Sequence, residues 1–133
     1  MASRASGTVA SRRKRAAIAF LRAAAAGHDV RGAAARLFSP GAKHHNAYFP
    51  AGMDALLSAI EAAAKANPRT RIEVQRAIAD GPFVAVHSKV VHRPGTPPIA
   101  VVHLFRFARD RVVELWDVGM PLPKRSPNRD GAF

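Results

Sequence analysis

The chain has 133 residues, with 21 Lys and Arg against 9 Asp and Glu, which gives a formal net charge of +12. The length fits a single domain, and a hydrophobic share of 48% supplies enough apolar material for one core. The absence of cysteine excludes disulfides, thiolate metal sites and cysteine nucleophiles, and it is compatible with the predicted cytoplasmic location. No run approaches the roughly 18 apolar residues that a membrane span needs, so none is expected.

The positive charge is concentrated towards the ends of the chain. Six basic residues precede the first acidic residue, Asp29, and three more lie between Lys124 and Arg129. The other basic residues are scattered, without the interleaved aromatic residues that a base-stacking surface uses. We therefore interpret the excess as a solvated surface, which argues against a nucleic-acid partner. An anionic partner stays the alternative, because a charge this large favours one.

The start of the chain is rich in Ser, Ala and Arg and contains no acidic residue. This composition resembles an organellar transit peptide, and it also fits a frayed leader that runs into the first helix. We favour the leader, because the apolar pattern begins almost at once, at Ala16. Residues 1–14 are therefore predicted to be a basic flexible leader, and residues 15–133 a single domain.

Helical patterns occupy the first half of the chain. Residues 11–26 are Ala-rich with apolar residues at helical spacing, and Gly27 can end this helix. Asp29 can cap a second short helix that runs to Phe38. After a short extended piece and a loop, one apolar stripe predicts a third helix over 53–66.

From Pro68 onwards the apolar period changes from helical to two, as in strands. Strands are predicted over about 72–78, 84–90, 99–107 and 112–118. Helices followed by strands with short turns indicate an α+β fold. The N-terminal helices are expected to close the concave side of a curved, mostly antiparallel sheet.

The last two predicted strands place a histidine opposite an aspartate. Along the first strand the odd-numbered residues are apolar except for His103, and along the second the odd apolar residues lead to Asp117. A hairpin buries both apolar sets on one face. Because both sets are odd-numbered, each odd residue must oppose an odd residue, and the two residue numbers have an even sum. A three-residue turn at 109–111 then pairs Phe107 with Val113, Phe105 with Leu115, and His103 with Asp117. Opposed Cβ atoms lie about 4.5–5.5 Å apart, which permits a contact between imidazole and carboxylate.

A histidine and an aspartate on an apolar inward face can exchange and hold protons. The carboxylate orients the ring and raises its basicity. Burial has the opposite effect, because it lowers the pKa of a histidine and raises the pKa of an aspartate. The sequence therefore leaves the direction of either pKa shift open. The residues alone support two readings equally, a catalytic pair and a buried ion pair without turnover.

Six further residues are predicted to line or border the same pocket. Val101, Phe105 and Leu115 share the inward face of His103. His87 is placed on the preceding strand, inside the pocket or at its rim. His45, with Asn46 beside it, is placed at the mouth, and Tyr48 either donates its hydroxyl into the cavity or covers it. His45, Tyr48 and His87 are the candidates for a donor to a developing oxyanion.

The spacing of the histidines along the chain matches no established set of metal ligands, so it indicates no metal site. The residues concerned are His44, His45, His87, His92 and His103. Trp116, on the outer face of the last strand, indicates packing against either a second subunit or the chain's own tail.

The C-terminal third resembles the signature of SnoaL-like proteins, which belong to the nuclear-transport-factor-like superfamily. The resemblance rests on Val101 to Phe107, on Arg111 to Val118 and on Pro121-Leu122-Pro123. His45-Asn46 is similar to an early His-Asn motif of the family. Asn67-Pro68 and the segment from Asn128 to Phe133 resemble a subgroup described as SnoaL-like aldol-condensation enzymes. The likeness extends over nearly the whole chain from about Arg15.

The resemblance implies a cone-shaped α+β barrel, commonly a homodimer, with an apolar cavity and no metal or organic cofactor. In polyketide cyclases of this class, a His and an Asp on these two strands are the proposed acid/base pair, and they fall on His103 and Asp117. Two departures stand out. Many members of the nearest subgroup carry Asp where this chain has His103, and His where it has Leu115. A pocket with different proton chemistry is therefore expected.

The leading hypothesis is an enzyme without a cofactor. His103, held by Asp117, removes a proton alpha to a carbonyl of a small apolar substrate, and aldol cyclisation, isomerisation or dehydration follows. The alternative is a protein of the same fold that binds a small apolar ligand without converting it.

Overall fold

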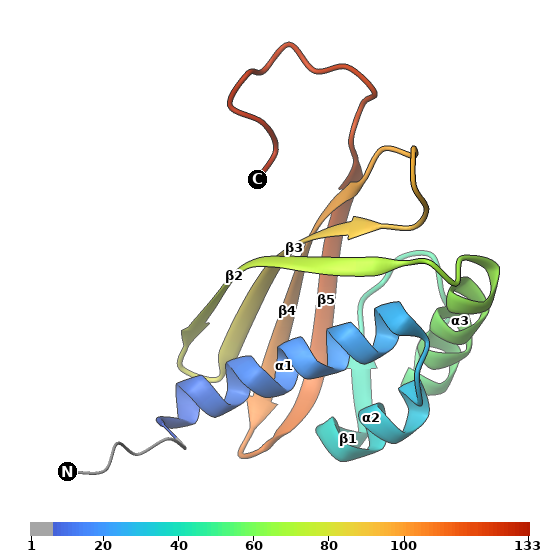
Figure 1. Cartoon of the computed structure of the whole chain (residues 1–133). Coiled ribbons are helices and arrows are strands. Elements are labelled where there is room, and N and C mark those ends of the chain that lie inside the picture. The colour runs from blue at the N-terminus through green and yellow to red at the C-terminus, as the bar shows by residue number, and fades with distance from the viewer. Residues whose placement is uncertain (1–6) are drawn as a thin grey trace.

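A computed structural model of the chain describes residues 7–133 (Figure 1). Three helices and one five-stranded sheet confirm the predicted α+β class. No helix in this range is long and apolar enough to cross a membrane. The elements are α1 (Val9–Ala26), α2 (Val30–Leu37), β1 (Phe38–His44), α3 (Met53–Ala66), β2 (Arg71–Asp80), β3 (Phe83–Val91), β4 (Ile99–Ala108) and β5 (Arg111–Pro121).

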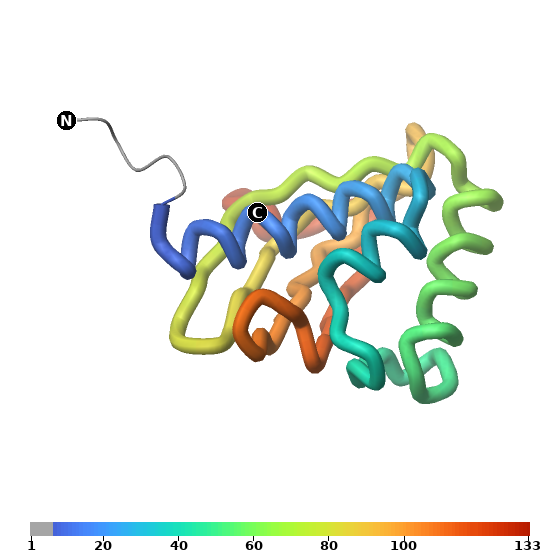
Figure 2. The backbone as a smooth tube through the Cα atoms, turned by 90° about the horizontal axis from the view of Figure 1, so that it is seen from below, coloured from blue at the N-terminus to red at the C-terminus, as the bar shows by residue number. Residues whose placement is uncertain are grey.

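The sheet has the strand order β1-β5-β4-β3-β2. The pairs β2–β3, β3–β4 and β4–β5 are antiparallel, and β1 runs parallel to β5, so the sheet is mostly antiparallel as predicted. Strands β1 and β2 form its two edges, which makes it an open curved sheet rather than a closed barrel. In Figure 1 the helix α1 crosses the face of the sheet, and α3 lies beyond β1; Figure 2 shows both from below.

The helix α1 starts earlier than the sequence pattern predicts. The hydroxyl of Thr8 accepts a hydrogen bond from the backbone N–H three residues later and caps the helix. Arg13 donates to a backbone carbonyl of the β4–β5 turn at 2.8 Å. The prediction of a flexible leader over 1–14 is therefore wrong from Val9 onwards, because the cap and this contact order the segment. Residues 1–6 of the predicted leader lie outside the described residues.

The hairpin between β4 and β5 contains a β-bulge that the sequence analysis did not predict. Ala108 pairs with Arg111 around a two-residue turn, and the register shifts between Arg106 and Phe107. Phe107 therefore opposes Val112, which is fully buried, and not Val113 as predicted. The extra residue on β5 restores the even sum farther along the hairpin.

Beyond the bulge the predicted register is confirmed. Phe105 opposes Leu115, and His103 opposes Asp117. Phe105 is fully buried and belongs to a continuous core between the sheet and the helices. The inward face of this hairpin is thus fixed by apolar burial, which also fixes the face on which His103 and Asp117 lie.

Truncation of Phe105 tests how much this core contributes to the free energy of unfolding. Phe105→Ala is expected to lower the free energy of unfolding by about 3–5 kcal/mol, because it removes a fully buried ring and leaves a cavity. The matched control Ile78→Ala, at a side chain that is 61% exposed, should change it by less than about 0.5 kcal/mol. Urea unfolding measures both values, and equal effects would contradict this assignment of the core.

Candidate active site

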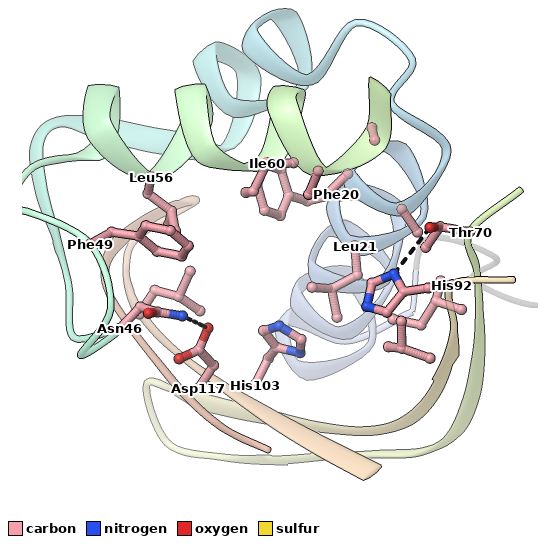
Figure 3. Close-up of a pocket in the computed structure, with 17 residues that line it drawn as sticks. Phe20, Leu21, Asn46, Phe49, Leu56, Ile60, Thr70, His92, His103 and Asp117 are labelled. Atoms are coloured by element: carbon pink, nitrogen blue, oxygen red, sulfur yellow. Dashed lines mark hydrogen bonds between the residues drawn. The ribbon is translucent and has the colours of Figure 1, made fainter. Parts of the chain in front are cut away.

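A pocket of about 220 Å³ lies between the concave face of the sheet and the helices α1 and α3 (Figure 3). Its walls are mainly apolar, with Phe20 and Leu21 from α1 and Leu56 and Ile60 from α3 among them. Polar side chains reach it from both ends and from the sheet. They are Asn46, Thr70, His92, His103 and Asp117. A mostly apolar cavity with a few converging polar groups is typical of a small-ligand site.

His103 and Asp117 both line this pocket, from neighbouring strands. They do not hydrogen-bond to each other. Asp117 instead accepts a hydrogen bond from the side-chain nitrogen of Asn46 at 3.0 Å, and Nδ1 of His103 is buried without a partner. The predicted facing positions are confirmed, whereas the predicted direct contact between imidazole and carboxylate is not formed.

The environment of His103 favours the uncharged ring. Burial among apolar groups lowers its pKa below the ordinary value of 6.5, and the charge of Asp117 raises it by a smaller amount. His103 is therefore an uncharged imidazole near neutral pH.

Asn46 is held in place by the loop after β1. Its backbone N–H donates to Nδ1 of His44 at 3.1 Å, and its side-chain oxygen accepts from the backbone N–H of Tyr48 at 2.9 Å. Nε2 of the buried His44 in turn donates to the carbonyl of Pro50 at 2.7 Å. These bonds fix the loop and direct the Asn46 amide at Asp117.

His92 and Thr70 form a second polar group at the other end of the pocket (Figure 3). The hydroxyl of Thr70 donates to the carbonyl of Asn67 at 2.8 Å. The same oxygen lies 3.1 Å from Nδ1 of His92. Both side chains therefore join the end of α3 to the neighbouring strands β2 and β3.

The predicted position of His45 in the pocket is wrong. The ring stacks on Trp116 at 5.0 Å, and its Nε2 lies 2.6 Å from a carboxylate oxygen of Glu114. Arg106 also binds Glu114, at 2.8 Å, and the bonds from Arg106 and then His45 lower the pKa of that carboxyl. The cause of the error is strand alternation, because the inward side chain at the end of β1 is that of His44.

Two other predicted pocket residues also lie outside it. His87 contacts Arg76 and stacks on Phe133 at 5.9 Å, on the outer face of the sheet. Tyr48 is 90% exposed, so its hydroxyl neither enters nor covers the cavity. The three predicted oxyanion donors are therefore excluded from that role by position.

The three apolar residues predicted to line the pocket differ in their positions in the structure. Leu115 lines the pocket, as predicted. Phe105 is buried in the core on the same face but does not line the pocket, and Val101 borders a separate shallow hollow near His87. Of these three residues, Leu115 alone therefore contributes to the pocket lining.

His92 is a pocket residue that the sequence prediction did not include, although the alternation along β3 indicates it. The even-numbered residues of β3 face inward, among them Val84, Val86 and Val90, and the next even position is His92. The same parity places His87 outward. Thr70 had no comparable signal, because it precedes β2 in a short connection whose path depends on the end of α3.

The pocket carries none of the chain's large positive charge in the form of Lys or Arg. No residue that lines it is of either type, and its one carboxylate is Asp117. Within residues 7–133, no three His, Asp or Glu side chains gather as a metal ion requires. The net charge therefore gives no information about the ligand of this pocket.

The fold resembles several solved structures. AclR from Streptomyces galilaeus, named as a candidate hydroxylase, aligns with a TM-score of 0.69 at 24% identity, over 84% of this chain and 90% of AclR. A candidate SnoaL-like polyketide cyclase from Jannaschia sp. CCS1 gives 0.69 at 16% identity, over 90% and 91%. An NTF-2-like protein of unknown function from Burkholderia xenovorans LB400 gives 0.69 at 18% identity, over 91% of both chains. These likenesses show the fold.

No curated protein gives a significant match to the sequence. The family model of the SnoaL-like domain matches residues 17–115, which run from α1 into β5 and include His103. This match spans most of the described fold and agrees with the likeness to solved structures. The chain belongs to the SnoaL-like domain family.

Proposed function

We propose that this chain is an enzyme that transfers a proton alpha to a carbonyl of a small apolar substrate. His103 acts as the base, and Asp117 supplies the charge that stabilises the protonated ring. The observation that carries the proposal is an imidazole and a carboxylate that line one apolar pocket from paired positions. Aldol cyclisation, isomerisation and dehydration all begin with this proton transfer.

The ring of His103 is suited to accept a proton. Because Nδ1 is buried, Nε2 is the nitrogen that a ligand in the pocket can reach. An uncharged ring with Nδ1–H presents its lone pair at Nε2. A base that is uncharged before the reaction needs no prior loss of a proton at neutral pH.

Asp117 would act through its charge and not through a direct bond. Its carboxylate raises the pKa of His103, which means that it stabilises the imidazolium more than the imidazole. The stabilisation is greatest once the proton has been transferred, so it favours the product of the step. Asn46 keeps the carboxylate in place through the bond of 3.0 Å.

Asn46 is also the protein donor best placed for the oxyanion. Its side-chain nitrogen carries two hydrogens, and the bond to Asp117 uses one of them. The second can donate to the enolate oxygen that forms when the alpha proton leaves. This assignment replaces the donors that the sequence analysis suggested.

The size of the pocket limits the substrate. A cavity of roughly 150 Å³ is enough to bind benzene. The pocket here, at about 220 Å³, fits a compact substrate of one or two rings. The name of the Jannaschia relative, a candidate polyketide cyclase, supports a cyclic ketone as the starting point for tests.

Deuterium exchange into 2-tetralone, a bicyclic ketone, tests the proton transfer directly. The wild-type chain in D₂O is expected to accelerate exchange at the alpha carbons, which NMR follows. His103→Gln should reduce the accelerated rate by about 10²-fold or more, because it removes the base. Asp117→Asn should also reduce it, since the imidazolium loses its counter-charge.

The control for this experiment is His28→Gln, which makes the same change at an exposed histidine that does not line the pocket. It should exchange at the wild-type rate. Circular dichroism and thermal unfolding establish that each variant is folded. Binding of 2-tetralone without accelerated exchange, or full exchange in both pocket variants, would contradict the proposed enzyme and favour a ligand-binding protein.

The lowered pKa of His103 also predicts a pH dependence of stability. Below 6.5 the unfolded chain protonates this ring, whereas the folded chain resists protonation until its lower pKa is reached. The free energy of unfolding should therefore fall as the pH drops below about 6.5, and the fall should be smaller in His103→Gln. Urea unfolding about one pH unit above and below 6.5 measures the difference. An identical pH dependence in the two proteins would show that His103 is not buried as described.

A further inference from the structure

The pocket has two polar ends, and the proposed chemistry uses one of them. Asn46 and Asp117 lie near the start of α3, whereas Thr70 and His92 lie near its end (Figure 3). In Figure 3 the ring of His92 points into the pocket, across from the pair at the other end, with His103 between them. A polar group directed into an apolar cavity needs a partner from the protein, water or a ligand.

The hydrogen bonds of Thr70 determine which nitrogen of His92 carries the proton. The hydroxyl hydrogen of Thr70 is donated to the carbonyl of Asn67 at 2.8 Å. The oxygen can then only accept in its contact of 3.1 Å with His92. Nδ1 of His92 is therefore the donor, and in the uncharged ring Nε2 is left as an acceptor with no protein partner in the described part of the chain.

The chemistry of the lining restricts what can bind this acceptor. The pocket contains a carboxylate and neither Lys nor Arg, so it disfavours an anionic ligand. An acceptor in such a site pairs with a neutral donor on the ligand, and a hydroxyl is the smallest such group that a ring can carry. A site built to accept a hydrogen bond discriminates against a ligand that lacks the donor.

We propose that Nε2 of His92 forms a subsite that binds a hydroxyl of the ligand, with Thr70 fixing the orientation of the ring. The ligand class is then a neutral, compact cyclic compound that carries a hydroxyl at the end opposite the group facing Asn46 and Asp117. This inference rests on the proposed small-ligand pocket and deepens it. It concerns binding alone, so it stands or falls separately from the proton transfer by His103.

A pair of inert probes tests the subsite. The probes are 2-naphthol and 2-fluoronaphthalene, in which fluorine replaces the hydroxyl and donates no hydrogen bond. The wild-type chain should bind 2-naphthol about fivefold more tightly than the fluorinated probe in calorimetric titrations. His92→Phe should lose this preference and keep its affinity for 2-fluoronaphthalene. Thr70→Val should weaken the preference, because the ring of His92 loses the bond that orients it.

The matched control is His87→Phe, the same substitution on β3 with the side chain on the outer face. It should retain the wild-type preference. Asp117→Asn separates the two ends of the pocket, and it too should retain the preference if the hydroxyl binds His92. A preference that survives in His92→Phe, or disappears only in Asp117→Asn, would overturn the proposal. Failure of both probes to bind the wild-type chain would overturn it as well.

A measurement on the unaltered protein avoids any effect of substitution on folding. The ¹⁵N shifts of the His92 ring should report a proton on Nδ1 and none on Nε2. Addition of 2-naphthol should shift the Nε2 resonance, and addition of 2-fluoronaphthalene should not. A proton on Nε2 in the uncharged ring, or equal shifts with both probes, would contradict the assigned acceptor.

Discussion

The register of one hairpin determines what the pocket of this protein contains. Strands β4 and β5 bury their apolar residues on one face, and a bulge after the two-residue turn brings His103 opposite Asp117. Without the extra residue, the same turn would place His103 opposite Trp116 and carry Glu114 to the inward face. Burial of Phe105 and Leu115 favours the observed register. The packing of the core and the chemistry of the site therefore depend on the same alignment.

This alignment produces opposing influences on one imidazole. Apolar surroundings favour the uncharged ring of His103, and the carboxylate across the strand pair favours the charged one. The carboxylate of Asp117 does not bind the ring directly but accepts a hydrogen bond from Asn46, which lies on a loop held by His44. The result is an imidazole whose uncharged form is favoured by burial, beside a charge that stabilises its protonated form. The proposed proton transfer on neutral substrates rests on this arrangement.

Much of this could be predicted from residue alternation, and the exceptions have physical causes. The helix over 53–66, the strands and the pairing of His103 with Asp117 follow from apolar periodicity, which reports which residues are buried together. The same periodicity indicates His92 when it is continued past the end of β3, and at the end of β1 it turns His44 and not His45 inward. The bond between Asn46 and Asp117 joins residues 71 positions apart through a loop, and no local pattern predicts such a bond.

Burial and the charge of Asp117 act in opposite directions on the pKa of His103. NMR titration of the His103 ring in the wild-type chain and in Asp117→Asn tests it most directly. The wild-type ring should titrate below pH 6.5, and the ring in Asp117→Asn should titrate lower still, because only the burial remains. A wild-type ring that titrates at or above 6.5, or one that Asp117→Asn leaves unchanged, would contradict this account of the site.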